Sequence, residues 1–172
     1  KAAVGDLDNV TRVVRLGGRY RFEGEGAALW MNRPLLIGFR FRSDAPVHEE
    51  LARLLGAEVL PVELADRRFY HLDTCFCPVD GKTALWFPKA FDRYGRKVIE
   101  RLVADPIEVS EADAKRFACN AIVVDRAIVM QAGVSSTLQR RLTRRGLALH
   151  LVDLSEFLKA GGSAKCLVLR LS

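Results

Sequence analysis

The chain has 172 residues, of which 49% are hydrophobic and 28% charged, and its mean hydropathy is +0.05. These proportions fit one ordinary globular domain and exclude the disordered, collagenous and low-complexity classes. No apolar run reaches the roughly 18 to 20 residues needed for a membrane span, and we expect no signal peptide. The formal net charge of +6 is mostly scattered along the chain, so we expect neither a nucleic-acid nor a membrane partner.

Hydrophobic periodicity predicts three amphipathic helices that recur roughly every 45 residues. Each helix is preceded by two strand-like runs and followed by one. The first unit has strands at Ala27–Trp30 and Leu35–Phe41, a helix at Ala45–Leu55 and a strand at Glu58–Val62. The second has Tyr70–Pro78, Thr83–Phe87, a helix at Lys89–Leu102 and Ile107–Val109. The third has Ala118–Asp125, Ala127–Gln131, a helix at Ser135–Arg145 and Ala148–Val152, and a last strand is expected at Cys166–Leu171.

The predicted fold is therefore α/β, built from three strand-strand-helix-strand units. A radial array of such units needs closure or capped ends, because an incomplete set exposes sheet edges. The chain also begins at Lys1 without an initiating Met. We therefore expect further units to precede Lys1.

One dense cluster of positive charge lies at residues 140–145, within the third predicted helix. Leu138 and Leu142 are four residues apart and form its apolar stripe, so we expect the arginines to form a solvated face.

The four cysteines, in a chain without a secretory signal, favour reduced thiols and a cytoplasmic location over a disulfide framework. Cys75 and Cys77 are too close in sequence for a metal knuckle, so no metal site is predicted.

Three segments carry residues suited to chemistry. In the first, Glu23 and Glu25 lie on a glycine-rich turn, Phe22-Glu23-Gly24-Glu25-Gly26. This turn is either merely solvated or a site for a cation, and its two negative charges exclude a phosphate loop.

The second segment contains His71 and Asp73. In a strand both side chains would point to one face, where the carboxylate would hold the imidazole and raise its pKa. The alternative is an ordinary structural histidine. That is the expectation for His48, early in a predicted helix, and for His150, in an apolar strand.

The third segment is Gly161-Gly162-Ser163-Ala164-Lys165-Cys166. A glycine pair before a single cysteine predicts an accessible thiol, and we expect Lys165 to help lower the pKa of Cys166. The alternative is a buried, inert cysteine. Together, the three segments offer a thiol nucleophile, a histidine acid or base and carboxylates that bind a cation.

These motifs resemble the guanidino-group-modifying enzymes, which include dimethylarginine dimethylaminohydrolase, arginine deiminase and the amidinotransferases. The resemblance rests on the Phe22-Glu23-Gly24 turn, on His71-Leu72-Asp73-Thr74 followed by Cys75-Phe76-Cys77-Pro78, and on Gly161-Gly162 before Cys166. It implies a five-bladed α/β propeller, the pentein-like fold. About three of the five modules would be present, so residues 1–172 would be a single-domain fragment, the C-terminal part of the catalytic domain.

The resemblance also implies a role for each site residue. Cys166 would attack the guanidinium carbon and form a covalent amidino-thioether, and His71 would protonate the leaving amine and then activate water. Glu23 and Asp73 would bind the guanidinium nitrogens of a small cationic substrate. Arg42 would pair with a substrate carboxylate. No cofactor is implied, and a homo-oligomer is left open.

The sequence departs from the family pattern at Ala27, where many relatives carry an aspartate. In addition, a substrate-binding carboxylate that relatives take from N-terminal modules has no counterpart here. Three functions remain open: a hydrolase acting on arginine or methylarginine, an amidinotransferase that passes the amidino group to an amine, and a catalytically incomplete fragment that binds guanidino ligands.

Overall fold

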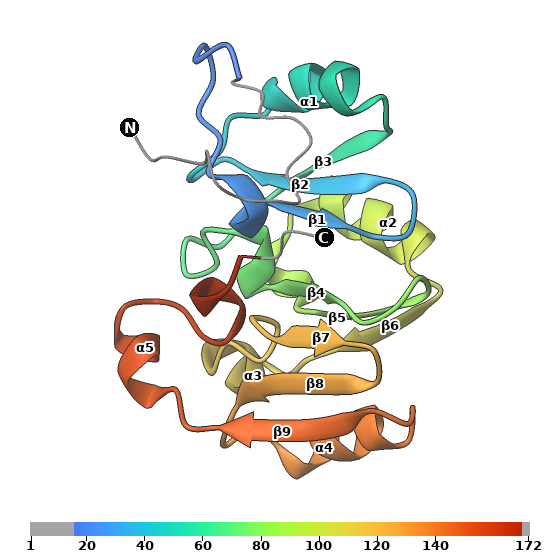
Figure 1. Cartoon of the computed structure of the whole chain (residues 1–172), viewed down its shortest axis with the longest axis vertical. Helices are drawn as coiled ribbons and strands as arrows, with labels where there is room; N and C mark the ends of the chain where they lie inside the picture. Colours follow the sequence, from blue (N-terminus) through green and yellow to red (C-terminus); the bar gives the residue numbers. More distant parts are fainter. Residues whose placement is uncertain (1–15, 170–172) are drawn as a thin grey trace, which may run out of the picture.

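The computed structural model describes residues 16–169 as three small sheets stacked along the length of the molecule (Figure 1). The first contains β1 (Ala28–Trp30), β2 (Leu35–Phe39) and β3 (Val59–Glu63). The second contains β4 (Phe76–Pro78), β5 (Thr83–Trp86) and β6 (Asp105–Glu108). The third contains β7 (Ile122–Val124), β8 (Ala127–Gln131) and β9 (Ala148–Val152).

Each sheet has the same internal topology. Its first strand pairs antiparallel with the second, as Ala28 does with Ile37, and the second pairs parallel with the third, as Leu35 does with Val59. A parallel pair requires a crossover connection. The helices α1 (Val47–Leu55), α2 (Arg93–Leu102) and α4 (Ser136–Thr143) supply the three crossovers. The predicted α/β fold of three strand-strand-helix-strand units is confirmed.

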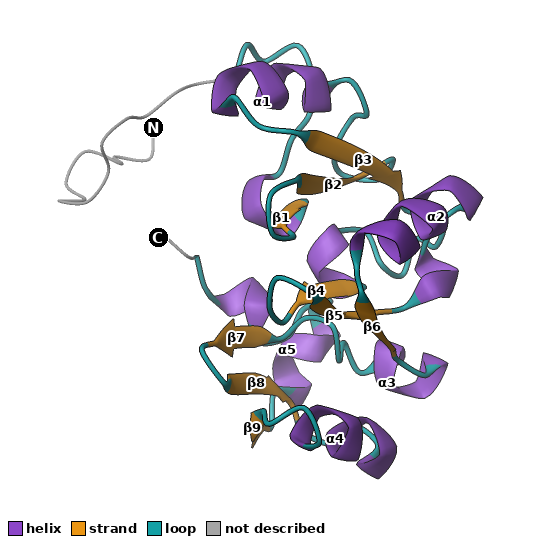
Figure 2. Ribbon diagram, turned by 90° about the vertical axis from the view of Figure 1, so that its right-hand side faces the viewer, coloured by secondary structure: helices purple, strands orange, loops and turns teal. Residues whose placement is uncertain are grey.

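The units share a common inner side. In Figure 2 the helices α1, α2 and α4 form an outer arc from top through right to bottom, and the first strands β1, β4 and β7 lie inside this arc. Residues of all three first strands, among them Trp30, Phe76 and Val123, line one apolar cavity of about 530 Å³. None of the helices described between residues 16 and 169 is long and apolar enough to cross a membrane.

Capping residues set the ends of the crossover helices. The Asp92 carboxylate accepts a hydrogen bond from the backbone N–H of Gly95 at 2.7 Å, and the Ser135 hydroxyl accepts one from Leu138 at 3.2 Å. Both bonds satisfy N–H groups that have no partner inside the helix. At the C-terminal end of α1, Gly56 has a φ of 61°, a conformation that glycine adopts without steric cost. Two short helices were not predicted: α3 (Glu111–Lys115), between the second and third units, and α5 (Ser155–Lys159), after the third unit.

Strand β2 connects two hydrophobic clusters because its residues alternate between two buried faces. Leu36 belongs to the main core, which extends through the second and third units. Leu35 and Ile37 pack instead against α1, with Val47 and Leu51. Burial on both faces is expected for the central strand of a sheet that a helix covers on one side and neighbouring units cover on the other.

Three predicted strands are largely wrong. Within Ala118–Asp125 only β7 is a strand, because a turn follows α3. Within Tyr70–Pro78 only β4 is a strand, because a short 3-10 helix, η2 (Leu72–Thr74), precedes it. The Thr74 hydroxyl donates to the His71 carbonyl at 2.6 Å, a local bond that competes with strand pairing. Within Cys166–Leu171 the structure has the 3-10 helix η4 (Lys165–Leu167) instead of a strand; positions 170 and 171 lie outside the described residues.

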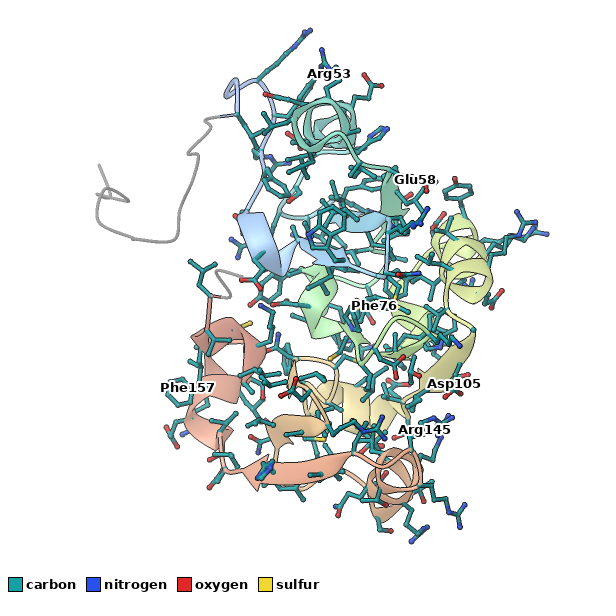
Figure 3. The ribbon with its side chains drawn as sticks, turned by 45° about the vertical axis from the view of Figure 1, so that its right-hand side comes forward. Arg53, Glu58, Phe76, Asp105, Arg145 and Phe157 are labelled. Atoms are coloured by element: carbon teal, nitrogen blue, oxygen red, sulfur yellow. The ribbon has the colours of Figure 1, made fainter. Side chains whose placement is uncertain are left out.

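The arginine cluster of α4 is only partly a solvated face. Arg145 donates two bonds of 2.6 Å to the Asp105 carboxylate on β6, and Arg141 donates to the Glu108 carbonyl at 2.5 Å. Figure 3 shows Asp105 and Arg145 side by side between the second and third units. The predicted burial of Leu138 and Leu142 is confirmed, but two of the arginines bind the neighbouring unit.

Candidate active site

The three predicted segments meet around one cavity of about 380 Å³. The turn with Glu23 leads into the 3-10 helix η1 (Gly24–Gly26). His71 directly precedes η2, Asp73 lies within η2, and Cys166 lies within η4. Figure 1 shows these segments coming together on one side of the stack, although they are far apart in sequence. Glu23, His71, Asp73 and Cys166 all line the cavity.

Glu23 and His71 form a direct pair. The Glu23 Oε2 atom lies 2.7 Å from Nε2 of His71, which fixes the orientation of the ring. Gly26 permits this approach, since a Cβ at that position would lie 2.9 Å from Nδ1 of His71. The turn closes through a hydrogen bond of 3.0 Å from the Ala27 backbone N–H to the Gly24 carbonyl.

Asp73 is the buried carboxylate of the site, with 3% of its surface exposed. Its Oδ2 atom lies 3.7 Å from the Cys166 sulfur, whereas Oδ1 is buried without a hydrogen-bond partner. Burial raises the pKa of Asp73 to about 6, and the nearby His71 and Lys165 offset part of this rise. Since Asp73 lies in a 3-10 helix, the expected shared strand face with His71 is wrong, although both side chains line the same cavity.

Cys166 is the exposed one of the four cysteines, and the other three are buried. Partial desolvation at the cavity raises the pKa of its thiol above the ordinary value, and the charge of Asp73 raises it further. The expected lowering of this pKa by Lys165 is wrong, because Lys165 forms an ion pair with Glu25 instead. Gly162 permits the turn, since a Cβ there would lie 2.9 Å from the Cβ of Cys166.

Arg42 lies at the edge of this arrangement. Its Nη1 is 3.5 Å from Oε1 of Glu23, and its guanidinium lies 5.2 Å from the ring centroid of Tyr70. The Tyr70 hydroxyl donates to the Gly161 carbonyl at 2.8 Å. Tyr70 therefore links the segment of His71 to the glycine pair before Cys166.

The sequence analysis did not identify Tyr70 or Asn120 as site residues. Tyr70 directly precedes His71, and this adjacency was the one feature of the sequence that could have marked Tyr70 as a site residue. Asn120 is a buried amide that contacts the backbone of both Asp73 and Cys166. Asn120 could have been recognised from the sequence because it is the single polar residue in the apolar stretch 117–124.

The other histidines lie away from the cavity. His48 Nδ1 bonds the Ala45 carbonyl at 2.7 Å within α1 and its preceding turn, and His150 is exposed on β9. Among residues 16–169, no group of three or more histidine, cysteine or acidic side chains is placed to hold a metal ion.

The site combines a thiol, an imidazole and carboxylates around a cavity. The carboxylates of Glu23 and Asp73 give it negative charge, which favours a small cation. An imidazole held by Glu23 is suited to proton transfer, and the Cys166 thiol is the available nucleophile.

Comparisons with known proteins agree with this set of groups. A family model described as N,N dimethylarginine dimethylhydrolase, eukaryotic, matches residues 8–172. The chain is 47% identical over 155 residues to the bifunctional arginine dihydrolase/ornithine cyclodeaminase ArgZ of Synechocystis sp., which covers 88% of this chain and 22% of ArgZ. It is 37% identical over 153 residues to the N(G),N(G)-dimethylarginine dimethylaminohydrolase of Mycobacterium tuberculosis, covering 89% of this chain and 50% of that protein.

Solved structures show the same similarity in three dimensions. The N-terminal domain of ArgZ bound to product matches with a TM-score of 0.90 and 45% identity, over 94% of this chain and 60% of that one. A variant of that domain, covalently bound to a reaction intermediate, gives the same values. The present chain thus spans about half, or less, of the length of these two curated relatives.

Proposed function

This chain belongs to the N,N dimethylarginine dimethylhydrolase family, and from that premise we propose that the protein hydrolyses the guanidino group of arginine or of a methylated arginine. Cys166 is the nucleophile, His71 the acid and base, and Glu23 and Asp73 hold the cationic group. The names of the relatives from Synechocystis and Mycobacterium tuberculosis support these two substrates.

The observation that carries the proposal is the carboxylate of Asp73. It is buried, lines the cavity and keeps Oδ1 without a partner. A buried acceptor without a donor is costly, and a charged one more so. A guanidinium presents several N–H donors in a planar fork that matches a carboxylate. Such a ligand would satisfy Oδ1, and its positive charge would favour the ionised form of Asp73.

The proposed first step forms a bond between the Cys166 sulfur and the guanidinium carbon. As the sulfur attacks, the thiol passes its proton to the imidazole of His71. Binding of a cation next to the sulfur favours this ionisation, whereas Asp73 otherwise raises the pKa of the thiol. A C–N bond of the resulting tetrahedral carbon then breaks. The amine leaves with a proton from His71, and an amidino-thioether remains on Cys166.

In the second step, water replaces the sulfur. His71, now without its proton, removes a proton from water as the oxygen attacks the amidino carbon. The C–S bond breaks, Cys166 recovers its electron pair and takes up the remaining hydroxyl proton, and the product contains a urea-type carbonyl. The 2.7 Å contact with Glu23 keeps the ring oriented through both steps.

Arg42 would bind a carboxylate at the far end of the substrate. It now contacts Glu23 and the ring of Tyr70, and more than half of its side chain is exposed. The Arg42 guanidinium is therefore free to form an ion pair with the carboxylate of a bound amino acid, and no buried group would have to move.

Turnover by matched cysteine variants tests the proposal. The full-length protein should release ammonia from arginine or methylamine from a methylated arginine. Cys166→Ala should lose this activity, whereas Cys77→Ala, which alters a buried thiol, should retain it. Release at the parent rate by Cys166→Ala would contradict the proposal. An amidino product formed only when an amine acceptor is added would point to a transferase instead.

A further inference from the structure

Asn120 is a fully buried polar residue that the proposed chemistry does not use. It lies between α3 and β7, and its neighbours Cys119 and Ala121 are also buried. A primary amide in such surroundings is costly unless its donors and acceptor are paired. The pairing of Asn120 therefore shows what the residue holds in place.

The Asn120 side chain joins the two segments that carry Asp73 and Cys166. Its Nδ2 donates to the backbone carbonyl of Asp73 at 3.2 Å. Its Oδ1 accepts from the backbone N–H of Ser163 at 2.8 Å and from that of Cys166 at 3.3 Å. The Asn120 carbonyl adds a bond of 3.1 Å from the backbone N–H of Lys165.

Only a side chain with both a donor and an acceptor can make these contacts. The Asp73 carbonyl needs a donor, and the two N–H groups of the Cys166 segment need an acceptor. An apolar residue at 120 would leave all three without this partner, and a carboxylate would face the Asp73 carbonyl with an oxygen. The segments that Asn120 joins are 93 residues apart at Asp73 and Cys166.

We infer that Asn120 is a positioning residue that fixes the Cys166 sulfur next to the Asp73 carboxylate by bonding the backbone of both segments. The inference deepens the proposed function and rests on it for the role of Cys166. The distance that Asn120 maintains is the 3.7 Å between Sγ of Cys166 and Oδ2 of Asp73.

The electrostatics of the thiol agree with this geometry. Burial and the charge of Asp73 raise the pKa of Cys166, whereas a hydrogen bond from Asn120 lowers it. Removing the amide should therefore loosen the Cys166 segment and move the thiol pKa upward.

The test compares Asn120→Ala with Gln131→Ala in the full-length protein. Gln131 is another buried amide of the third unit, and its Oε1 accepts from the Leu154 N–H at 2.8 Å, away from the site cavity. The measurements are the rate of Cys166 alkylation by iodoacetamide from pH 6 to 10, resolved by peptide mass spectrometry, and kcat and KM. Melting temperatures report the general loss of stability.

We expect both variants to melt at lower temperature, but only Asn120→Ala to shift the alkylation profile toward higher pH. It should also lower kcat by about tenfold or more, since small displacements of reacting groups cost up to about a hundredfold. An unchanged profile and kcat would overturn the inference. Asn120→Asp supplies a second test: in its ionised form it keeps an acceptor for Cys166 but has no donor for the Asp73 carbonyl and adds a negative charge, so at high pH its profile should also shift upward.

The alkylation profile does not depend on any substrate. If the protein has no guanidino hydrolase activity but Asn120→Ala still shifts the profile, the proposed function fails and the positioning role of Asn120 stands. If Asn120→Ala does not fold, Asn120→Ser is compared with Gln131→Ala in the same way, because its short hydroxyl cannot bridge the two segments. A profile for that variant equal to the parent's would also overturn the inference.

Discussion

In the proposed function the carboxylate of Asp73 binds the cationic substrate, and its burial carries a cost in folding free energy. Burial disfavours its ionised form, which raises its pKa to about 6. Its charge in turn disfavours the Cys166 thiolate. Under the proposed function, a bound cationic substrate would offset both effects, because its charge would favour the ionised forms of Asp73 and Cys166.

Asp73→Asn should stabilise the fold at neutral pH and remove activity. Because the folded-state pKa of Asp73 lies above its ordinary value, the stability it contributes is present below about pH 4 and is lost as the pH rises through about 6. The free energy of unfolding of Asp73→Asn, relative to that of the parent, should therefore rise by about 1 to 3 kcal/mol between pH 4 and pH 7. Urea unfolding at both pH values measures the gain.

A constant difference between Asp73→Asn and the parent across this pH range would contradict the raised pKa. Retained turnover by the variant would contradict the binding role of Asp73. Asp153→Asn is a suitable control, because Asp153 is exposed and its pKa is lowered by bonds from Ser155.

At the scale of elements, α4 is bound to the second unit by polar contacts as well as by its apolar stripe. The fork of Arg145 on Asp105 is bidentate, with both distances at 2.6 Å. Exposed ion pairs contribute little stability. This pair is bidentate and its arginine side chain is only 32% exposed, so its contribution lies toward the upper end of the usual range.

Arg145→Ala should lower the free energy of unfolding by about 1 kcal/mol at low salt. Arg144→Ala, at an exposed neighbouring position, should have almost no effect. The difference should shrink in about 1 M salt, where exposed charges are screened. Equal effects of the two variants in chemical denaturation would show that the pair does not join the units.

Asp113 joins the start of α3 to the start of α4. This buried carboxylate accepts bonds from the Ser110 hydroxyl at 2.8 Å and from the Ser135 backbone N–H and hydroxyl at 2.7 and 2.8 Å. Asp113→Ala leaves these donors unpaired.

The expected loss for Asp113→Ala is about 2 to 4 kcal/mol, measured by urea unfolding. Glu156→Ala on α5, where the glutamate only contacts Lys159 at the surface, should cost less than about 0.5 kcal/mol. A cost for Asp113→Ala as small as that of the control would contradict the proposed link.

The repeated elements were predictable because their signals are local. Helical spacing marked α1, α2 and α4, and apolar runs marked the strands within a few residues. The errors fall where distant contacts decide the backbone. Bonds of η4 to Asn120 replace the strand expected at Cys166, and the pairing of His71 with Glu23 crosses 48 residues. A sequence pattern does not contain such partners, so the residues that line the cavity were predictable but their geometry was not.

At the scale of the whole molecule, the site forms only when the units pack together. Glu23 precedes the first sheet, His71 and Asp73 precede the second, and Cys166 follows the third. Each sheet therefore acts as a rigid support, and the loops at one side carry the functional groups. The apolar cavity between β1, β4 and β7 adjoins the site cavity, since Asp73 and Lys165 line both.

The central claim is that Cys166 forms a covalent bond to the guanidino carbon. The most direct measurement is acid quenching of the full-length protein during turnover of arginine or a methylated arginine, followed by peptide mass spectrometry. The account predicts an amidino adduct on the peptide that contains Cys166, which appears with substrate and disappears when substrate is exhausted. Amine release at the parent rate without any adduct on Cys166, or with the adduct on another residue, would contradict it.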